Sequence, residues 1–156
     1  MDGKLGIIAG GGGLPHEVAS SCRAGGRPVY VVRLKGFADD AMKGFPGAEF
    51  GIAEFGHIFK ALKNEGVASV CFAGAVKRPE FSALKPDLRG LAAMPGIIAA
   101  ARRGDDAVLR QVMGEFEKEG FTIEGAHEAV ADLALARGPL GRVAHTAEHE
   151  GDIARA

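Results

Sequence analysis

The stretch KLGIIAGGGGLPHEVASSC, residues 4–22, decides the fold class of this 156-residue chain. Its first part, KLGIIAG (4–10), is apolar on both faces, as expected of a buried parallel strand. Four glycines, Gly10 to Gly13, come next, and Pro15 suits the first turn of a helix. Apolar residues then recur at helical spacing: Leu14, Val18 and Cys22. Strand, glycine turn and helix in this order predict the first unit of an α/β fold.

The rest of the chain repeats this alternation. Short apolar runs predict further strands at 28–34, 49–53, 67–74 and 121–125. Helical spacing predicts helices from about 14 to Gly25-Gly26, over 56–65, over 91–103 with a break or kink near Pro95-Gly96, over 105–120 and over 126–135. We therefore expect a Rossmann-like α/β fold, a parallel sheet of about five strands with helices on both faces. A strand order of 3-2-1-4-5 would bring together the carboxyl ends of strands one and four, where ligands bind in this architecture.

Composition excludes several classes of protein. The net charge of −1 and pI of about 6.5 leave no basic excess for nucleic acid. Cys22 and Cys71 form no CxxC motif, so neither a disulfide framework nor a zinc site is indicated, and a reducing cytosol fits. No signal peptide is recognisable. The longest apolar run, LAAMPGIIAAA (91–101), is far shorter than the roughly 18 residues that cross a bilayer. The sequence thus predicts a cytoplasmic protein without a transmembrane segment, and leaves contact with a membrane surface open.

The end of the chain differs from the rest. Its large apolar residues between 137 and 156 are few: Leu140, Val143 and Ile153. We expect residues 1–136 to form an α/β substrate-binding domain and residues 137–156 to be a linker-like tail leading to a C-terminal domain outside this chain. A frayed C-terminus is the alternative.

The glycine run resembles a nucleotide-binding loop but departs from the known patterns. In the dinucleotide fingerprint G-x-G-x-x-G, the third glycine position is taken here by Pro15. Leu34 and Lys35 stand where the NAD-binding acid is expected, and no G-K-[ST] of a Walker A loop follows. The backbone N–H groups of Gly10 to Gly13 at a helix start still suit an anion. The loop therefore predicts phosphate contact, with a ligand-free turn as the alternative.

A second loop, AVKRPEFSALKPDLRG (75–90), is predicted to leave the neighbouring strand end. It carries four cations: Lys77, Arg78, Lys85 and Arg89. Next to the glycine loop, these cations would pair with a diphosphate. The apolar stretch 91–101 follows at once, so the two together suit a ligand with a phosphate head and acyl chains. A solvated loop followed by a core helix is the alternative.

Acidic and histidine residues offer weaker candidates. Asp105 and Asp106 could bind a divalent cation, but capping of the following helix is the favoured interpretation. His127 and Glu128 suit an acid–base pair or a polar turn. The pair His145 and His149 has metal-site spacing, but lacks the acid of H-E-x-x-H and is not predicted to bind metal.

Four segments, taken in order, resemble a known family. IAGGGGLP, AGAVKRPEFSALKPDLRG, GDDAVLRQV and EGAHE are similar to segments of the LpxI-type UDP-2,3-diacylglucosamine pyrophosphatases of lipid A biosynthesis. The resemblance covers nearly all of residues 4–155. It implies a Mg²⁺-dependent hydrolase of Gram-negative bacteria that cleaves UDP-2,3-diacylglucosamine to UMP and 2,3-diacylglucosamine 1-phosphate (lipid X).

The resemblance also implies how the work is divided along the chain. Family members are nearly twice as long, and their essential catalytic aspartate belongs to the C-terminal half, so no catalytic or metal-binding residue is assigned here and this chain alone is expected to be inactive. The resemblance carries over substrate-binding roles only. They fall on Gly10, Gly11, Gly12, Gly13 and Leu14 through backbone, on Lys77 and Arg78 at phosphate, on Lys85 and Arg89 as weaker candidates, and on Asp105 and Asp106 as polar or metal contacts.

Other functions and assemblies remain open at this point. A nucleotide- or nucleotide-sugar-binding module without hydrolase activity is the main alternative, and an oxidoreductase domain is disfavoured by the incomplete fingerprint. The expected partners are a nucleotide-lipid substrate and the protein's own C-terminal domain. The sequence does not decide between a monomer and a homodimer, or whether the protein works at the inner face of the inner membrane.

Overall fold

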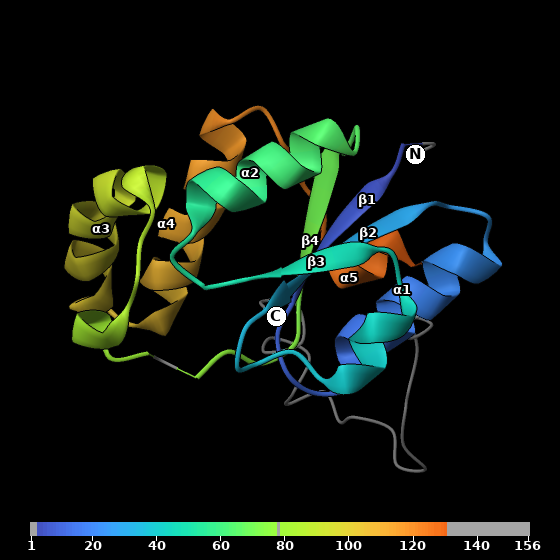
Figure 1. The fold of residues 1–156 in the computed structure, drawn as a ribbon, viewed down its shortest axis with the longest axis horizontal. Coiled ribbons are helices and arrows are strands. Elements are labelled where there is room, and N and C mark those ends of the chain that lie inside the picture. The colour runs from blue at the N-terminus through green and yellow to red at the C-terminus, as the bar shows by residue number, and fades with distance from the viewer. Residues whose placement is uncertain (1–2, 78, 131–156) are drawn as a thin grey trace, which may run out of the picture.

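The computed structural model describes residues 3–77 and 79–130. Within them, five parallel strands form one sheet in the order β3-β2-β1-β4-β5 (Figure 1). The strands are β1 (Leu5–Ala9), β2 (Val29–Leu34), β3 (Gly47–Phe50), β4 (Ser69–Ala73) and β5 (Thr122–Ile123). The predicted strand order is therefore confirmed, and β1 and β4 lie side by side at the point where the order reverses.

Helices cover both faces of the sheet, as predicted. They are α1 (Leu14–Ala24), α2 (Phe55–Asn64), α3 (Leu88–Ala101), α4 (Asp105–Lys118) and α5 (Ala126–Ala129), with short 3₁₀ helices η1 (Asp40–Gly44) and η2 (Phe81–Ala83). Figure 1 shows α1 and α5 on one side of the sheet, and α2, α3 and α4 on the other. The hairpin formed by α3 and α4 extends beyond the sheet, so its helices can wall a space at the strand ends.

Two apolar cores, one on each face of the sheet, follow from the alternation of side chains along the strands. On one face, Ile7 and Val31 pack with Val18 of α1. On the other, Ile8 and Val32 pack with α2, α3 and α4. This second core centres on Phe116, whose ring lies against a set of aromatic rings: Phe55, Phe59, Phe72 and Phe121. Its aromatic packing anchors α4 to the sheet.

Several predicted boundaries are wrong. The third strand spans Gly47–Phe50 rather than 49–53, and the fifth has only two residues. The helix predicted over 91–103 spans Leu88–Ala101, and it begins earlier because Asp87 caps it by accepting a hydrogen bond from the Gly90 N–H at 2.7 Å. The last helix ends at Ala129 instead of 135, and residues 131–135 lie outside the described part of the chain.

Helix α3 is not broken at Pro95. Proline lacks the N–H for a helical hydrogen bond, and its ring crowds the preceding turn. The helix nevertheless runs unbroken from Leu88 to Ala101. Its small and apolar residues pack inward: Gly90, Ala93, Ile97, Ala100 and Ala101. Packing against α2 and α4 offsets the local cost of the proline.

An ion pair lies at the amino end of the sheet, away from the ligand-binding edge. Arg27 donates two hydrogen bonds of 2.9 Å to the carboxylate of Glu124, whose side chain is only 2% exposed. Arg27 also donates to the Ser69 hydroxyl at 3.1 Å. The Arg27 guanidinium lowers the pKa of the Glu124 carboxyl below its usual value, although burial opposes the shift. The pair joins the loop before β2 to the end of β5.

Cys22 and Cys71 are both free and buried, so the prediction of no disulfide is confirmed. Burial raises the pKa of the Cys71 thiol to about 11, which keeps it protonated and unreactive at neutral pH. Among residues 3–77 and 79–130, no helix has the length and hydropathy needed to cross a membrane.

Candidate functional site

The carboxyl ends of β1 and β4 are tied together by backbone hydrogen bonds. The Gly10 N–H donates to the Ala73 carbonyl at 2.8 Å. Gly11 and Ala75 then form an antiparallel bridge with two hydrogen bonds, each 2.8 Å long. The glycine loop and the loop that carries Lys77 are therefore neighbours, as the predicted strand order required.

The glycines of the first loop have different roles. A Cβ added at Gly10 would lie 2.6 Å from the Ala75 carbonyl oxygen, so glycine there allows the two strand ends to approach. A Cβ at Gly13 would meet nothing within 4 Å, and Gly13 is the N-cap residue of α1. Close packing against Ala75 therefore requires glycine at position 10, whereas the space around Gly13 is open.

Most N–H groups of the glycine loop already have acceptors inside the protein. Gly10 and Gly11 donate to the loop after β4, and Gly12 donates to the Asp39 carboxylate at 2.9 Å. In the first turn of a helix the N–H groups have no intrahelical acceptor. An anion above this loop would therefore meet the N–H groups of Gly13 and Leu14, beside the carboxylate of Asp39.

An apolar pocket of about 510 Å³ opens next to these strand ends. Its floor is formed by residues of the sheet, among them Ile8, Leu34 and Phe72. Its walls come from α2, α3 and α4: Phe55, Ile58, Met94, Ile97, Val108, Leu109, Val112 and Phe116. The volume is within the roughly 300–1,000 Å³ typical of small-molecule sites, and the lining suits hydrocarbon.

Three charged residues line this pocket. Lys77, after β4, and Asp105 and Asp106, at the start of α4, all contribute to its lining. Lys77 is exposed and forms no ion pair with another described residue, whereas Asp106 is paired with Arg110. The structure thus brings together three of the predicted site residues, on an apolar cavity. Arg78 lies outside the described residues.

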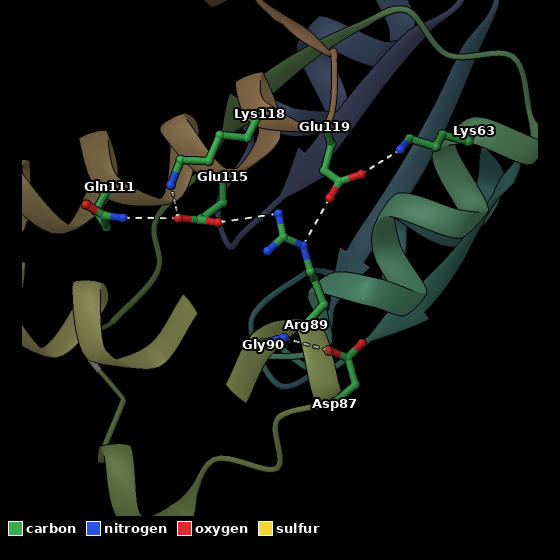
Figure 2. A network of polar contacts seen from close by, with 8 residues as sticks. All are labelled: Lys63, Asp87, Arg89, Gly90, Gln111, Glu115, Lys118 and Glu119. Atoms are coloured by element: carbon green, nitrogen blue, oxygen red, sulfur yellow. Dashed lines mark hydrogen bonds and ion pairs between the residues drawn. The ribbon is translucent and has the colours of Figure 1, made fainter. Parts of the chain in front are cut away.

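Lys85 and Arg89, the weaker candidates, do not line the pocket. Lys85 is exposed before α3. Arg89 points to the end of α4, where its Nε donates to Glu119 at 3.0 Å and its guanidinium lies 3.7 Å from the Glu115 carboxylate (Figure 2). Lys63 of α2 also contacts Glu119, at 2.6 Å. Arg89 therefore holds α3 against α4 and α2 in this structure.

Glu115 is the buried member of the same network. Its carboxylate accepts hydrogen bonds from Lys118 at 2.7 Å and from Gln111 at 3.1 Å (Figure 2). Both carboxylates of the network thus have cationic partners, which offsets the cost of burying Glu115. The network joins the helices that wall the pocket.

The chain is similar to known proteins of one family. Residues 4–133 match the LpxI N-terminal domain. The chain belongs to this family. The chain is also 60% identical over 153 residues to the UDP-2,3-diacylglucosamine pyrophosphatase LpxI of Caulobacter vibrioides. That alignment covers 98% of this chain and 55% of the relative, so the chain spans about half the relative's length.

The acidic pair of this LpxI N-terminal domain is not a helix cap. Gly104 is the N-cap residue of α4, and Asp105 and Asp106 occupy its first turn, where acidic charge favours the positive end of the helix. The predicted capping role is wrong in this detail. Across the part of the chain that is described, no group of three or more His, Cys, Asp or Glu could hold a metal ion. Asp105 and Asp106 are two neighbouring carboxylates, fewer than such a group.

His127 and Glu128 do not line the pocket. Glu128 accepts a hydrogen bond from the Gly125 N–H at 2.7 Å, so its carboxylate helps to begin α5. Helix α5 contacts α1 and β4 instead of the pocket. His145 and His149 lie outside the described residues.

Sequence reasoning missed two features of the LpxI-family site. Asp39, in the loop after β2, belongs to none of the predicted motifs, but its carboxylate accepts a hydrogen bond from the Gly12 N–H of the glycine loop. The helical spacing of Val108 and Val112 predicts that they face the core, but both residues line the pocket. Spacing along α4 indicated a buried face without indicating that part of this face borders an empty volume.

Proposed function

We propose that this chain is the substrate-holding half of a hydrolase that cleaves the pyrophosphate of UDP-2,3-diacylglucosamine. The products would be UMP and 2,3-diacylglucosamine 1-phosphate, with the elements of water added across the broken P–O bond. The observation that carries the proposal is the apolar pocket with Lys77 on its lining, beside the glycine loop. The relative from Caulobacter vibrioides, named for this activity, supports the choice of substrate.

The pocket would bind hydrocarbon of the substrate. Phe72, Val112 and Phe116 expose carbon to it, so an acyl chain entering the pocket would leave water. Lys77 would neutralise phosphate charge at the same place, and the first-turn N–H groups of α1 would contribute a second anion contact. Arg78, which the structure does not describe, stays a predicted phosphate contact.

The proposal includes parts that lie beyond this chain. Catalytic residues and a C-terminal domain would come from sequence that the longer relatives have, and we keep Mg²⁺ as the expected cofactor. The described residues include no group of three or more metal-ligating side chains, and we assign no step to the metal. We also propose that the protein works in the cytoplasm, at the inner face of the inner membrane, where a diacyl substrate would be found.

Ligand binding to a pocket variant tests the proposal. Replacement of Val112 by Trp would fill part of the pocket and should weaken binding of 2,3-diacylglucosamine 1-phosphate at least about tenfold, measured by calorimetry. UMP binding should change little, because the added ring occupies only the apolar volume. Glu117→Trp, exposed on the same helix and away from the pocket, is the matched control.

The proposal fails if neither ligand binds to this chain or to a protein of the relative's full length. A full-length protein that binds both ligands and releases no UMP would favour the alternative, a nucleotide-sugar-binding module. Assay of UMP release from UDP-2,3-diacylglucosamine separates these outcomes.

A further inference from the structure

Asp39 is held at the glycine loop by backbone contacts on both sides. Its Oδ2 accepts a hydrogen bond of 2.9 Å from the Gly12 N–H. Its carbonyl oxygen accepts one of 3.0 Å from the Met42 N–H of η1. The loop after β2 also passes close to the glycine loop, since a Cβ added at Gly11 would lie 3.0 Å from the Phe37 carbonyl oxygen. The carboxylate therefore has a defined position, although Asp39 is exposed.

One oxygen of the Asp39 carboxylate has no partner among the described residues. Its Oδ1 makes no hydrogen bond or ion pair there, whereas the neighbouring Asp40 pairs with Lys43 at 2.6 Å. A Cβ added at Gly12 or Gly13 would meet nothing within 4 Å, so the space at this part of the loop is open. An acceptor with unused lone pairs therefore lies beside open space at the glycine loop.

A carboxylate in this place selects a hydroxyl over a phosphate. It repels an anion that lies directly over Gly12, and it accepts hydrogen bonds from O–H groups. Each carboxylate oxygen has two lone pairs, so Oδ2 can accept from a hydroxyl as well as from Gly12. In doubly wound α/β sheets, an acid that follows the second strand binds the hydroxyls of a ribose whose phosphate lies at the first helix. The chemistry therefore indicates a ribose diol.

The order of groups along the substrate fits this place. The apolar pocket is walled by α2, α3 and α4, and neither Gly12 nor Asp39 lines it. Asp39 precedes η1, which contacts α1, and Figure 1 shows α1 on the opposite side of the sheet from these three helices. Lys77 lines the pocket, and Gly13 begins α1. With acyl chains in the pocket, the diphosphate would span the two loops and the ribose would reach Asp39.

We propose that Asp39 determines specificity for a ribonucleotide by accepting hydrogen bonds from the 2′ and 3′ hydroxyls of the ribose. The inference rests on the proposed function and deepens it, because it assigns the UMP half of the substrate to the glycine loop. Asp39 binds substrate here and breaks no bond. Its carboxylate orients the nucleotide, with the 5′ phosphate at the first-turn N–H groups of α1.

Calorimetry with UMP and 2′-deoxy-UMP on the 156-residue chain tests the proposal. The chain should bind UMP at least about tenfold more tightly, because 2′-deoxy-UMP lacks a hydroxyl that donates to a charged acceptor. In Asp39→Asn this preference should fall below about threefold, since the amide oxygen still accepts from the Gly12 N–H but the amide N–H₂ cannot accept from a hydroxyl. The ratio of the two affinities is the readout, because loss of the negative charge strengthens phosphate binding for both nucleotides.

Asp40→Asn is the matched control, because Asp40 is the exposed neighbour of Asp39 and pairs with Lys43. It should keep the parent's preference for UMP. A purely structural role for Asp39 would change both affinities by the same factor, and an unchanged ratio in Asp39→Asn would overturn the proposal. Equal binding of the two nucleotides by the parent, or no binding of UMP, would also overturn it, and this comparison needs no variant.

Hydroxyls of the glucosamine are a second source of the same chemistry. If Asp39→Asn weakened binding of 2,3-diacylglucosamine 1-phosphate at least about tenfold and left the nucleotide ratio unchanged, Asp39 would bind the glucosamine and the ribose assignment would be wrong. Failure here is distinguishable from failure of the proposed function. A chain that binds 2,3-diacylglucosamine 1-phosphate without preferring UMP to 2′-deoxy-UMP would contradict the role of Asp39 alone.

Discussion

The backbones of Gly11 and Ala75 exchange two hydrogen bonds of 2.8 Å, and this exchange closes the switch point of the sheet. It places the loop after β1 directly against the loop after β4. Ala75 stands two residues before Lys77, so the same contact positions the cation at the pocket. Under the proposed function, stability and ligand binding are therefore linked through one short stretch of backbone.

Replacement of Gly74 by Ala should destabilise the fold by about 3 kcal/mol. Gly74 has φ +90°, and a Cβ there would lie 2.6 Å from the Gly11 carbonyl oxygen. Gly13→Ala is the matched control: Gly13 has helical φ of −72° and open space, so alanine should be neutral or stabilise by up to about 1 kcal/mol. Urea unfolding measures both. Equal midpoints for the two variants would contradict this account of the loop.

Lys77→Ala should weaken binding of 2,3-diacylglucosamine 1-phosphate at least about tenfold, the loss expected for one charge-assisted hydrogen bond. Lys85→Ala should change the affinity less than about twofold, because Lys85 is exposed and does not line the pocket. Calorimetry on a protein of the relative's full length compares the two. A larger loss at Lys85 would place the phosphate elsewhere on the loop.

Arg89 and Glu119 should be energetically coupled. A double-mutant cycle with Arg89→Ala and Glu119→Gln should give about 0.5–1 kcal/mol in urea unfolding, a modest value because Arg89 is more than a third exposed. The pair Asp106 and Arg110, exposed on a single helix, should give less than about 0.5 kcal/mol. Zero coupling for Arg89 would mean that the network of Figure 2 does not hold α3 against α4.

Acid unfolding should depend on Glu124. Its pKa in the folded protein lies below the usual value near 4.5, because Arg27 hydrogen-bonds to the charged carboxylate. The unfolded state therefore binds the proton more readily, so the stabilisation is present above pH 4.5 and is lost as the pH falls below it.

Glu124→Gln should cost about 3 kcal/mol at pH 7, since it leaves Arg27 without its buried partner. It should also make the free energy of unfolding fall less steeply as the pH is lowered. Urea unfolding at a series of pH values measures both effects. Glu117→Gln, at an exposed position of α4, should leave the pH dependence of the unfolding free energy unchanged. If the Glu124 variant lost stability in acid as steeply as the parent, another carboxylate would dominate acid unfolding.

The amino-acid sequence by itself determined the class of fold. Apolar runs, as over β1 and over residues 29–32 of β2, bury both faces of a strand, and this pattern is local and can be recognised without contacts. Helix ends were also predictable where a glycine marks them: Gly25 ends α1 as expected. The juxtaposition of the two loops followed, because the ends of β1 and β4 meet in any sheet of this order.

Only the tertiary structure decided which candidate residues share a site. Lys77 and Arg89 belong to one predicted cationic loop, yet Lys77 reaches the pocket while Arg89 pairs with acids of α4. Likewise, Asp39 approaches Gly12 from 27 residues away. The direction of a side chain depends on helix starts and on partners distant in sequence, which spacing does not encode. An empty apolar volume arises in the same way, because it is bounded by several elements and belongs to none of them.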